Sequence, residues 1–263
     1  LTLRWLLPIV LILGLIVGTI VFYYSQIALT YWWAPAAEPS GLASMGTEAG
    51  LNPLPLKVPQ ALGWDDLGQL LQQIQSQPYL LVVVLMVAVA CTVQQRFLIA
   101  GAVILLIGNA YILSAHWAQV LLFLHPTAFK ISDPLFSQDI SFYIFGLPLW
   151  KLLEFWLKGI FLFAFAAVGL IYLTSGNSLS EGIFPGFSPG QRRHLNGLGG
   201  GLMLLVAGGY WLDCYELLYS TRGVSYGAGF TDVNVQLPVD IILALSALAI
   251  SIHLLSKAIV GYV

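Results

Sequence analysis

The stretch GYWLDCYELLYSTRG, from Gly209 to Gly223, places two carboxylates and an arginine among aromatic residues at the end of an apolar run. Asp213 and Glu216 are three residues apart, so they share one face of a helix. Arg222, in the loop just beyond, is the natural counter-charge for one of them. This combination suits three kinds of site: a paired-carboxylate site for a proton or cation, an enzyme active site, or a structural charge cluster at a membrane boundary.

The depth of these carboxylates in a membrane distinguishes the alternatives. If their helix begins near Leu195, Asp213 lies ~27 Å along it, close to the far edge of a hydrocarbon core that is ~30 Å thick. The neighbouring aromatic residues then form an interfacial belt made of Tyr210, Trp211, Tyr215 and Tyr219. We therefore favour a structural outer-face cluster of Asp213, Glu216 and Arg222 over a proton or cation site.

Two other sets of residues have the chemistry to hold a ligand. Asp232 and Asn234 end a glycine-rich run and offer oxygen atoms to a metal ion, but EF-hand spacing is absent. His116 and His253 lie within or near apolar runs and could ligate a haem or a pigment, although isolated membrane histidines more often serve in packing. The sequence has no zinc-protease, nucleophile-elbow or triad pattern. We therefore predict no catalytic residue, no metal and no cofactor.

The composition identifies the surroundings of these residues. Of the 263 residues, 59% are hydrophobic and 8% are charged, and the mean hydropathy is +0.87. A soluble domain carries roughly one quarter charged residues, so we expect a polytopic membrane protein with lipids as partners. The formal net charge of −2 provides no basic field for nucleic acid, which we exclude as a partner.

Runs of about 20 apolar residues, the length needed to cross the hydrocarbon core, predict an all-α fold. We expect a polytopic transmembrane helical bundle with about six spanning helices and short amphipathic or interfacial helices in the outer loops. The predicted spans are residues 3–24, 78–95, 97–120, 149–174, 195–219 and 238–260, in one transmembrane domain over 1–263. Gly197 and Gly201 in the fifth span predict a close-packing face. Glu154 and Lys158, near the outer start of the fourth, predict a salt bridge.

The basic residues predict the orientation of these helices. Arg4, Arg96, Arg192, Arg193 and Lys257 lie at the ends of the chain or in short turns, which the alternation of helices places on one side. The positive-inside rule makes that side cytoplasmic. Both ends of the chain are therefore predicted to be cytoplasmic.

The first outer loop, residues 25–77, begins without periodicity and then becomes amphipathic. Residues 64–77 read WDDLGQLLQQIQSQ and predict a short helix with an apolar stripe. The stripe consists of Leu67, Leu70, Leu71 and Ile74. Because this helix has no Lys or Arg, we expect its stripe to cover the membrane helices or a partner subunit rather than anionic lipid.

The second outer loop contains a segment rich in aromatic residues that we expect to lie along the membrane interface as an elbow. Asp133-Pro134 is a turn signal. Ser137 can cap a short helix with Asp139 in its first turn, and Gly146 fits the end of that helix.

Two motifs in these segments resemble one known family. DPLFSQDISFYIFGLP (Asp133–Pro148) and GYWLDCYELLYSTRGVSYGAGFTDV (Gly209–Val233) are similar to motifs of an uncharacterised family of large bacterial multi-pass membrane proteins. The resemblance covers roughly residues 78–263, and the first loop departs from it. It implies a seven-helix membrane region followed by a large C-terminal extracytoplasmic domain, so this chain would lack one helix and that domain. It also implies a bacterial plasma membrane or an internal, thylakoid-type membrane, and no established activity.

For the function, we expect a non-catalytic membrane protein that anchors an outer domain or serves as an accessory subunit beside other membrane-protein subunits. A transporter or channel for a small solute or lipid is the first alternative, for which Asn109 is the clearest polar residue at mid-membrane depth. An enzyme acting at the outer face on a lipid-linked substrate is the second. That alternative depends on Asp213, Glu216, Arg222 and Asp232.

Overall fold

The computed structural model describes residues 3–33, 59–60, 62, 68, 70, 72–73, 75–77, 79–174, 186–220 and 227–260. These residues form helices and turns and contain no strand, although Ser132 and Asp139 make one isolated antiparallel bridge. The all-α class predicted from the apolar runs is therefore confirmed.

The α-helices in chain order are α1 (Leu3–Trp33), α3 (Tyr79–Val93), α4 (Gln95–Ala115), α5 (Trp117–Leu124), α6 (Leu147–Thr174), α8 (Pro189–Glu216) and α9 (Leu237–Val260). A 3-10 turn, Leu217–Tyr219, follows α8. Two π turns, Phe142–Gly146 and Asp232–Gln236, lead directly into α6 and α9. In both cases the second residue of the following α-helix is a proline, Pro148 or Pro238.

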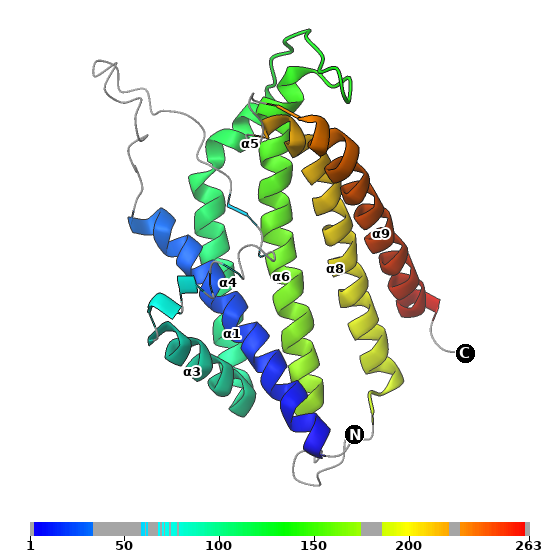
Figure 1. Cartoon of the computed structure of the whole chain (residues 1–263). Coiled ribbons are helices and arrows are strands. Elements are labelled where there is room, and N and C mark those ends of the chain that lie inside the picture. Colours follow the sequence, from blue (N-terminus) through cyan, green and yellow to red (C-terminus); the bar gives the residue numbers. More distant parts are fainter. Residues whose placement is uncertain are drawn as a thin grey trace.

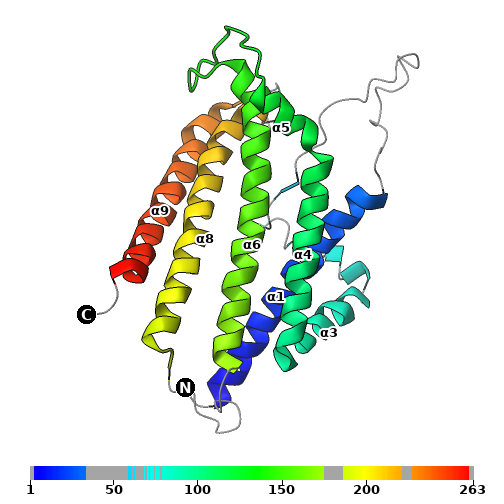
Figure 2. The same cartoon turned by 180° about the vertical axis from the view of Figure 1, so that it is seen from behind.

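The helix α6 lies in the middle of the bundle, with α1 and α4 on one side and the antiparallel pair α8 and α9 on the other (Figures 1 and 2). Tilted α1 packs against α3, α4 and α6. The starts of α6 and α9 and the last turn of α8 form one end of the bundle, which we call the elbow end. The last turns of α6 and α9 and the first turn of α8 form the opposite end, which we call the arginine end.

Five helical segments are long and apolar enough to cross a membrane: Leu6–Thr30, Gln95–Ala115, Phe142–Thr174, Pro189–Tyr219 and Asp232–Val260. The predicted span at residues 78–95 is shorter. Its helix, α3, has 15 residues, which corresponds to ~22 Å against a hydrocarbon core of ~30 Å. Among the described residues, the number of helices with spanning length is therefore five and not six.

Other helix boundaries also differ from the predicted ones. α1 continues to Trp33 instead of ending at 24. The span predicted at 97–120 is divided at His116, whose backbone angles (φ −98°, ψ 18°) leave the helical range between α4 and α5. α8 begins earlier than 195, because Ser188 and Gln191 form a reciprocal capping box and Pro189 occupies the first turn.

Each long helix buries one narrow face and exposes the rest. In the five segments, between 22% and 39% of the most apolar window is buried. The core joins α1, α4 and α6 through enclosed side chains such as Phe155 and Ile20. The outward faces are apolar as well, as Ile107 and Ile242 illustrate. Continuous apolar surface on this scale is unfavourable in water and fits helices that face lipid.

Close contacts of α8 occur at glycines that do not form one face. A Cβ atom added at Gly201 would lie 2.3 Å from an aromatic ring of α6, and one added at Gly200 would lie 2.7 Å from a leucine of α9. Gly197 has more room, since its added Cβ would meet only Ala258, at 3.9 Å. The two predicted glycines therefore have different surroundings: α6 approaches α8 at Gly201, and α9 approaches it at Gly200.

Part of the first loop lies against the bundle. The Tyr23 hydroxyl of α1 donates a hydrogen bond to the Gln60 carbonyl over 3.0 Å, and Leu62 packs against the core. This short piece lies between α4 and α6 (Figures 1 and 2). Leu70, from the predicted amphipathic stripe, is buried, and the described residues near it are helical. The other three stripe residues, Leu67, Leu71 and Ile74, lie outside the described residues.

Candidate functional site

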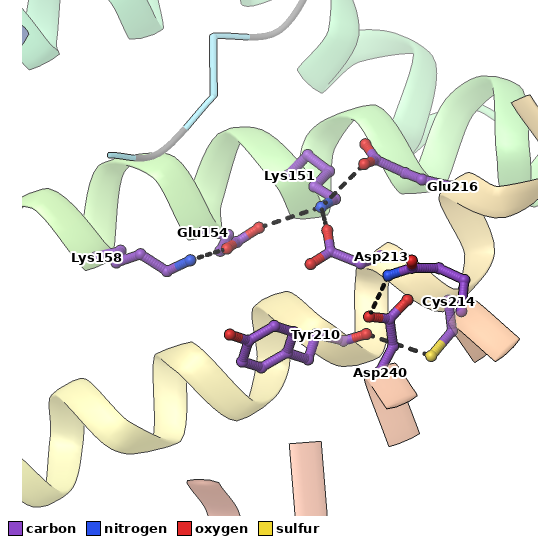
Figure 3. Close-up of polar contacts among 9 residues, drawn as sticks. Lys151, Glu154, Lys158, Tyr210, Asp213, Cys214, Glu216 and Asp240 are labelled. Atoms are coloured by element: carbon purple, nitrogen blue, oxygen red, sulfur yellow. Dashed lines mark hydrogen bonds and ion pairs between the residues drawn. The ribbon is translucent and has the colours of Figure 1, made fainter. Parts of the chain in front are cut away.

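A row of charged side chains joins α6 to the end of α8, and we call it the Lys151 network (Figure 3). Lys151 Nζ donates a hydrogen bond to Asp213 and lies 3.2 Å from Glu216 Oε2. It also lies 3.6 Å from Oε2 of Glu154, one turn further along α6. On the other side of Glu154, Lys158 Nζ donates to Oε1. The network therefore alternates in charge, and the pairing of Glu154 with Lys158 agrees with their predicted salt bridge.

Burial differs along the network. The side chains of Glu154, Lys151 and Lys158 on α6 are 10%, 14% and 19% exposed. The carboxylates of Asp213 and Glu216 are 43% and 44% exposed. Placing a charge in an apolar interior costs several kcal/mol unless the charge is paired. The charged side chains of α6 are therefore stabilised by pairing with each other and with the carboxylates at the end of α8.

Gly209 allows the charged pair of α6 to lie directly against α8. A Cβ at this position would be 2.3 Å from Glu154 Oε1 and 3.0 Å from Lys158 Nζ. Lys158 lies midway along the helical segment Phe142–Thr174. The network thus extends deeper into the bundle than the sequence predicts, because the helix begins before residue 149.

Two members of the predicted outer-face cluster, Asp213 and Glu216, lie in this network, and Arg222 lies outside the described residues. The cation that the structure places between the two carboxylates is Lys151, which is 62 residues from Asp213 in the chain. Sequence spacing cannot reveal such a contact between two helices. One signal was nevertheless present, because a lysine within an apolar helix needs a carboxylate partner.

The residues considered for metal binding form local contacts. Asp232 accepts a hydrogen bond from the amide of a glycine three residues earlier, over 2.9 Å. Asn234 donates from Nδ2 to a carbonyl four residues earlier, over 2.8 Å. Buried Asp240 of α9 accepts from Gln236 Nε2 over 2.9 Å and lies beside Cys214 (Figure 3). Across the described ranges, no group of three His, Cys, Asp or Glu side chains is arranged to hold a metal ion.

The two histidines considered for cofactor binding belong to different parts of the bundle. His116 is buried at the junction of α4 and α5, and its Nδ1 lies 2.7 Å from the Ile112 carbonyl oxygen. His253 is exposed on α9. Because α4 and α9 lie on opposite sides of α6 (Figure 1), the structure does not bring these histidines into one site.

The elbow, residues Asp133–Gly146, begins with a turn at positions 134–136 that includes Pro134. Four donors converge on the Asp133 carboxylate: the amides of Leu135 (2.8 Å), Phe136 (2.6 Å) and Gln138 (2.9 Å) and the hydroxyl of Tyr143 (2.7 Å). Desolvation opposes ionisation of Asp133, but the hydrogen bonds outweigh it and lower its pKa below the ordinary value. The carboxylate therefore shapes the turn.

A second aspartate, Asp139, caps the helical turn that follows. It accepts hydrogen bonds from the amides of Ser141 (2.8 Å), Lys130 (2.8 Å) and Phe129 (3.2 Å), and the bond from Ser141 is the main cause of its lowered pKa. Ser137 is not the cap, since its φ of 57° places it in the left-handed region before the helix. This corrects the predicted capping role of Ser137.

Gly146 does not end a helix. The Leu147 amide donates to the Phe142 carbonyl across the π turn, and the chain continues into α6 without a break. The predicted stop at Gly146 is therefore wrong, because the wider turn joins the elbow to α6.

Aromatic side chains attach the elbow to the end of α8. The Tyr219 hydroxyl donates to the Tyr143 carbonyl over 2.7 Å. The Tyr215 ring lies 4.8 Å from the ring of Phe136 and 5.1 Å from that of Phe142, measured between centroids. The two motifs noted in the sequence are thus in contact, next to the Lys151 network.

The described residues thus form an all-α bundle with five helices of spanning length and a paired charge network that begins near one end. A family model described as "Uncharacterised protein family (UPF0182)" matches residues 1–262, so the chain belongs to this family. The match includes the first outer loop, residues 25–77. The resemblance of the two motifs covers only residues from about 78 onward.

Relatives of the chain come from several bacteria. A family member from Nostoc sp. is 49% identical over 258 residues, which are 98% of this chain and 24% of that protein. One from Synechocystis sp. is 37% identical over 250 residues, 95% of this chain and 23% of that protein. One from Mycobacterium bovis is 42% identical over 153 residues, 57% of this chain and 15% of that protein. The chain thus spans about a quarter of the length of the first two relatives. No solved structure matches it.

Proposed function

We propose that this chain is the membrane-embedded, non-catalytic part of a larger protein, and that it anchors an outer domain or assembles with other membrane-protein subunits. The Lys151 network carries the proposal. Lys151 pairs with two carboxylates of α8 and so holds α6 against α8, and Lys158 pairs with Glu154 of its own helix. Neither lysine is therefore left available to a substrate. The length of the relatives supports an anchoring role, because about three quarters of the Nostoc protein lies outside the matched region.

The distribution of basic residues supports an orientation for the module. Arg96 at the start of α4, Arg192 and Arg193 at the start of α8, and Lys257 near the end of α9 belong to the arginine end. The positive-inside rule makes this end cytoplasmic and the elbow end external. The bacterial relatives support a plasma membrane or an internal, thylakoid-type membrane as the location.

Cysteine accessibility tests this placement. Gln138→Cys in the elbow should react with a membrane-impermeant maleimide in intact cells, and Gly190→Cys should react only after permeabilisation. Both positions are exposed, whereas Cys91 and Cys214 are buried and provide the unreactive background. The reverse pattern would reject the orientation. Equal labelling of both sites in intact cells would reject membrane embedding.

The anchoring role needs a separate test on a full-length family member. Purification from native membranes in mild detergent should retain partner subunits in fixed proportion, or show the outer domain held by the bundle in limited proteolysis. A lone protein whose outer part behaves identically with and without the bundle would contradict the proposal.

One observation favours transport as a second candidate. Asn109 is 3% exposed, and neither atom of its amide has a hydrogen-bond partner within the described part of the chain. Leaving such groups unpaired costs about 1–3 kcal/mol each, and polar residues inside a membrane often mark substrate or ion pathways. If Asn109 lines a solute path, Asn109→Leu should abolish flux in proteoliposomes while the protein stays folded. If the bundle is only an anchor, the wild-type protein should show no flux.

A further inference from the structure

A groove at the arginine end is lined by residues of the first turns of α8 and the last turn of α9. It has a volume of about 520 Å³ and is lined by Gly190, Arg193, His194, Gly197, Leu198 and Ala258. The groove is shallow and open to its surroundings and is not an enclosed pocket. Among the described residues that line it, Arg193 is a cation, His194 is an imidazole, and none is acidic.

Arg193 is held in place with most of its donors unused. Its Nε donates to the Ala258 carbonyl of α9 over 2.9 Å, which fixes the plane of the guanidinium. Within the described residues Arg193 has no ion pair and no other hydrogen bond. A guanidinium has five N–H donors in a planar fork, and this fork matches two oxygens of a phosphate. The fixed orientation lowers the entropy lost when an anion binds.

His194 is the second polar group of the groove. Its Nδ1 lies 2.7 Å from the hydroxyl oxygen of Tyr172 on α6. When the hydroxyl donates to Nδ1, the proton of the neutral imidazole is on Nε2, which is then a donor. Tyr172 thus supports a histidine that can share an anion with Arg193.

Two glycines keep the groove open. A Cβ added at Gly190 would meet nothing within 4 Å, and one added at Gly197 would meet only Ala258, at 3.9 Å. These positions leave space beside Arg193 that larger residues would fill. Leu198 gives the same groove an apolar wall.

We propose that this groove binds the phosphate group of an anionic lipid headgroup, held by Arg193 and His194. Basic pockets between membrane helices on the cytoplasmic side are known to suit such headgroups. The side chains lie in the first turns of α8, at the end of a segment of spanning length. The phosphate chemistry follows from the groove alone, whereas its lipid source rests on the proposed membrane placement.

Binding to the detergent-solubilised chain tests the inference with three probes of stated composition. They are dioctanoyl phosphatidylglycerol, dioctanoyl phosphatidylcholine and inorganic phosphate, each titrated while the dissociation constant is measured by native mass spectrometry or thermal shift. We expect binding of phosphatidylglycerol at least about tenfold tighter than binding of phosphatidylcholine, and Arg193→Gln should weaken it about tenfold or more, as expected for loss of a charge-assisted contact.

Two variants control for net charge and for folding. Arg192→Gln removes the same charge from the next residue, which does not line the groove, and should change the affinity by less than about twofold. Gly197→Leu keeps both arginines and fills the open space, so it should lose binding while raising helix propensity. Each variant is compared with the wild type by its unfolding temperature in lipid-free detergent.

The results separate the sources of the phosphate. Tight binding of inorganic phosphate that Arg193→Gln abolishes, without added affinity for phosphatidylglycerol, would support the anion groove and overturn the lipid source. Equal losses in Arg192→Gln and Arg193→Gln, or wild-type affinity in Gly197→Leu, would overturn the groove. Neither result would bear on the anchoring role, which the full-length protein tests.

Discussion

The elbow end and the arginine end of the bundle differ in how their basic side chains are buried and paired. Near the elbow end Lys151 is largely enclosed, as is Lys158 deeper in the bundle, and each is paired with a carboxylate of the bundle. At the arginine end, Arg193 is exposed, and its side-chain hydrogen bond within the described residues goes to a backbone carbonyl. The comparison shows that a charge placed between helices must be satisfied by the bundle itself. A charge at the rim can be satisfied from outside.

The largest expected effect tests the enclosed side of this comparison. Lys151→Met would remove the cation shared by Asp213 and Glu216 and leave Glu154 with Lys158 alone. Because two of these carboxylates are partly exposed, we expect a loss of about 3 kcal/mol in the free energy of unfolding, the lower end of the range for a buried pair. Thermal unfolding in detergent and the yield of folded protein measure it. The pairwise coupling should be visible in a double-mutant cycle with Glu216→Gln, since removing both partners should cost less than the sum of the single changes.

Two results would break the comparison at this end. Normal stability of Lys151→Met would mean that the carboxylates are satisfied without it. Additive effects in the cycle would show that Lys151 and Glu216 do not act together, and the ion-path reading would then gain support.

An intermediate effect is expected in the elbow. Asp133→Ala removes an acceptor of four hydrogen bonds, and we expect a loss of about 2–3 kcal/mol for the elbow. Hydrogen exchange at the amides of Leu135, Phe136 and Gln138 should accelerate. Gln138→Ala is the matched control, because only the backbone of Gln138 bonds to Asp133. Unchanged exchange in Asp133→Ala would show that the turn does not need its carboxylate.

The same aspartate gives the elbow a pH dependence of known sign. The folded pKa of Asp133 is lowered, so its contribution to stability is present above its unfolded pKa of about 3.9 and is lost as the pH falls through the folded value. Amide exchange in the elbow should therefore accelerate below about pH 4, after correction for intrinsic exchange. Asp133→Asn cannot ionise and should remove this dependence at the amides of Leu135, Phe136 and Gln138, whereas the amides bonded to Asp139 should keep theirs, because the pKa of Asp139 is also lowered.

The smallest effect is expected at the arginine end. In lipid-free detergent, Arg193→Gln loses one hydrogen bond to Ala258 and no ion pair to described residues, so its stability should fall by no more than about 1 kcal/mol. The unfolding temperature measures this directly. A loss as large as that of Lys151→Met would mean that both ends are fixed by charge, and the contrast between them would disappear.

The sequence predicted those parts of the molecule that depend on local spacing. The apolar runs indicated an all-α bundle, and the four-residue spacing of Glu154 and Lys158 indicated their pair. The sequence does not predict that Lys151 pairs with Asp213, because a contact between two helices depends on how each helix is rotated about its axis and shifted along it. The span predicted at 78–95 is three residues longer than α3, mainly because Gln94 has extended backbone angles (φ −141°, ψ 119°) and separates α3 from α4.

Local capping was harder to predict than the helices. Ser137 and Asp139 have equally suitable side chains for a cap, and the choice between them depends on backbone angles that follow from the Asp133 turn. The glycines of α8 show the same limit. Several are available, and the approach of the neighbouring helices decides which are contact points: α6 at Gly201 and Gly209, and α9 at Gly200.

The π turns before α6 and α9 determine the direction in which the side chains of these two helices point about the helix axis. Such a turn holds about one residue more than an α turn, which rotates the later side chains by ~100° about the helix axis. The wider turn also accommodates Pro148 and Pro238, which cannot donate a backbone hydrogen bond. Lys151 and Asp240 come less than two turns later. The direction of each side chain therefore depends on the number of residues in the turn before it. Deleting one elbow residue would turn Lys151 away from α8 without altering a single charge.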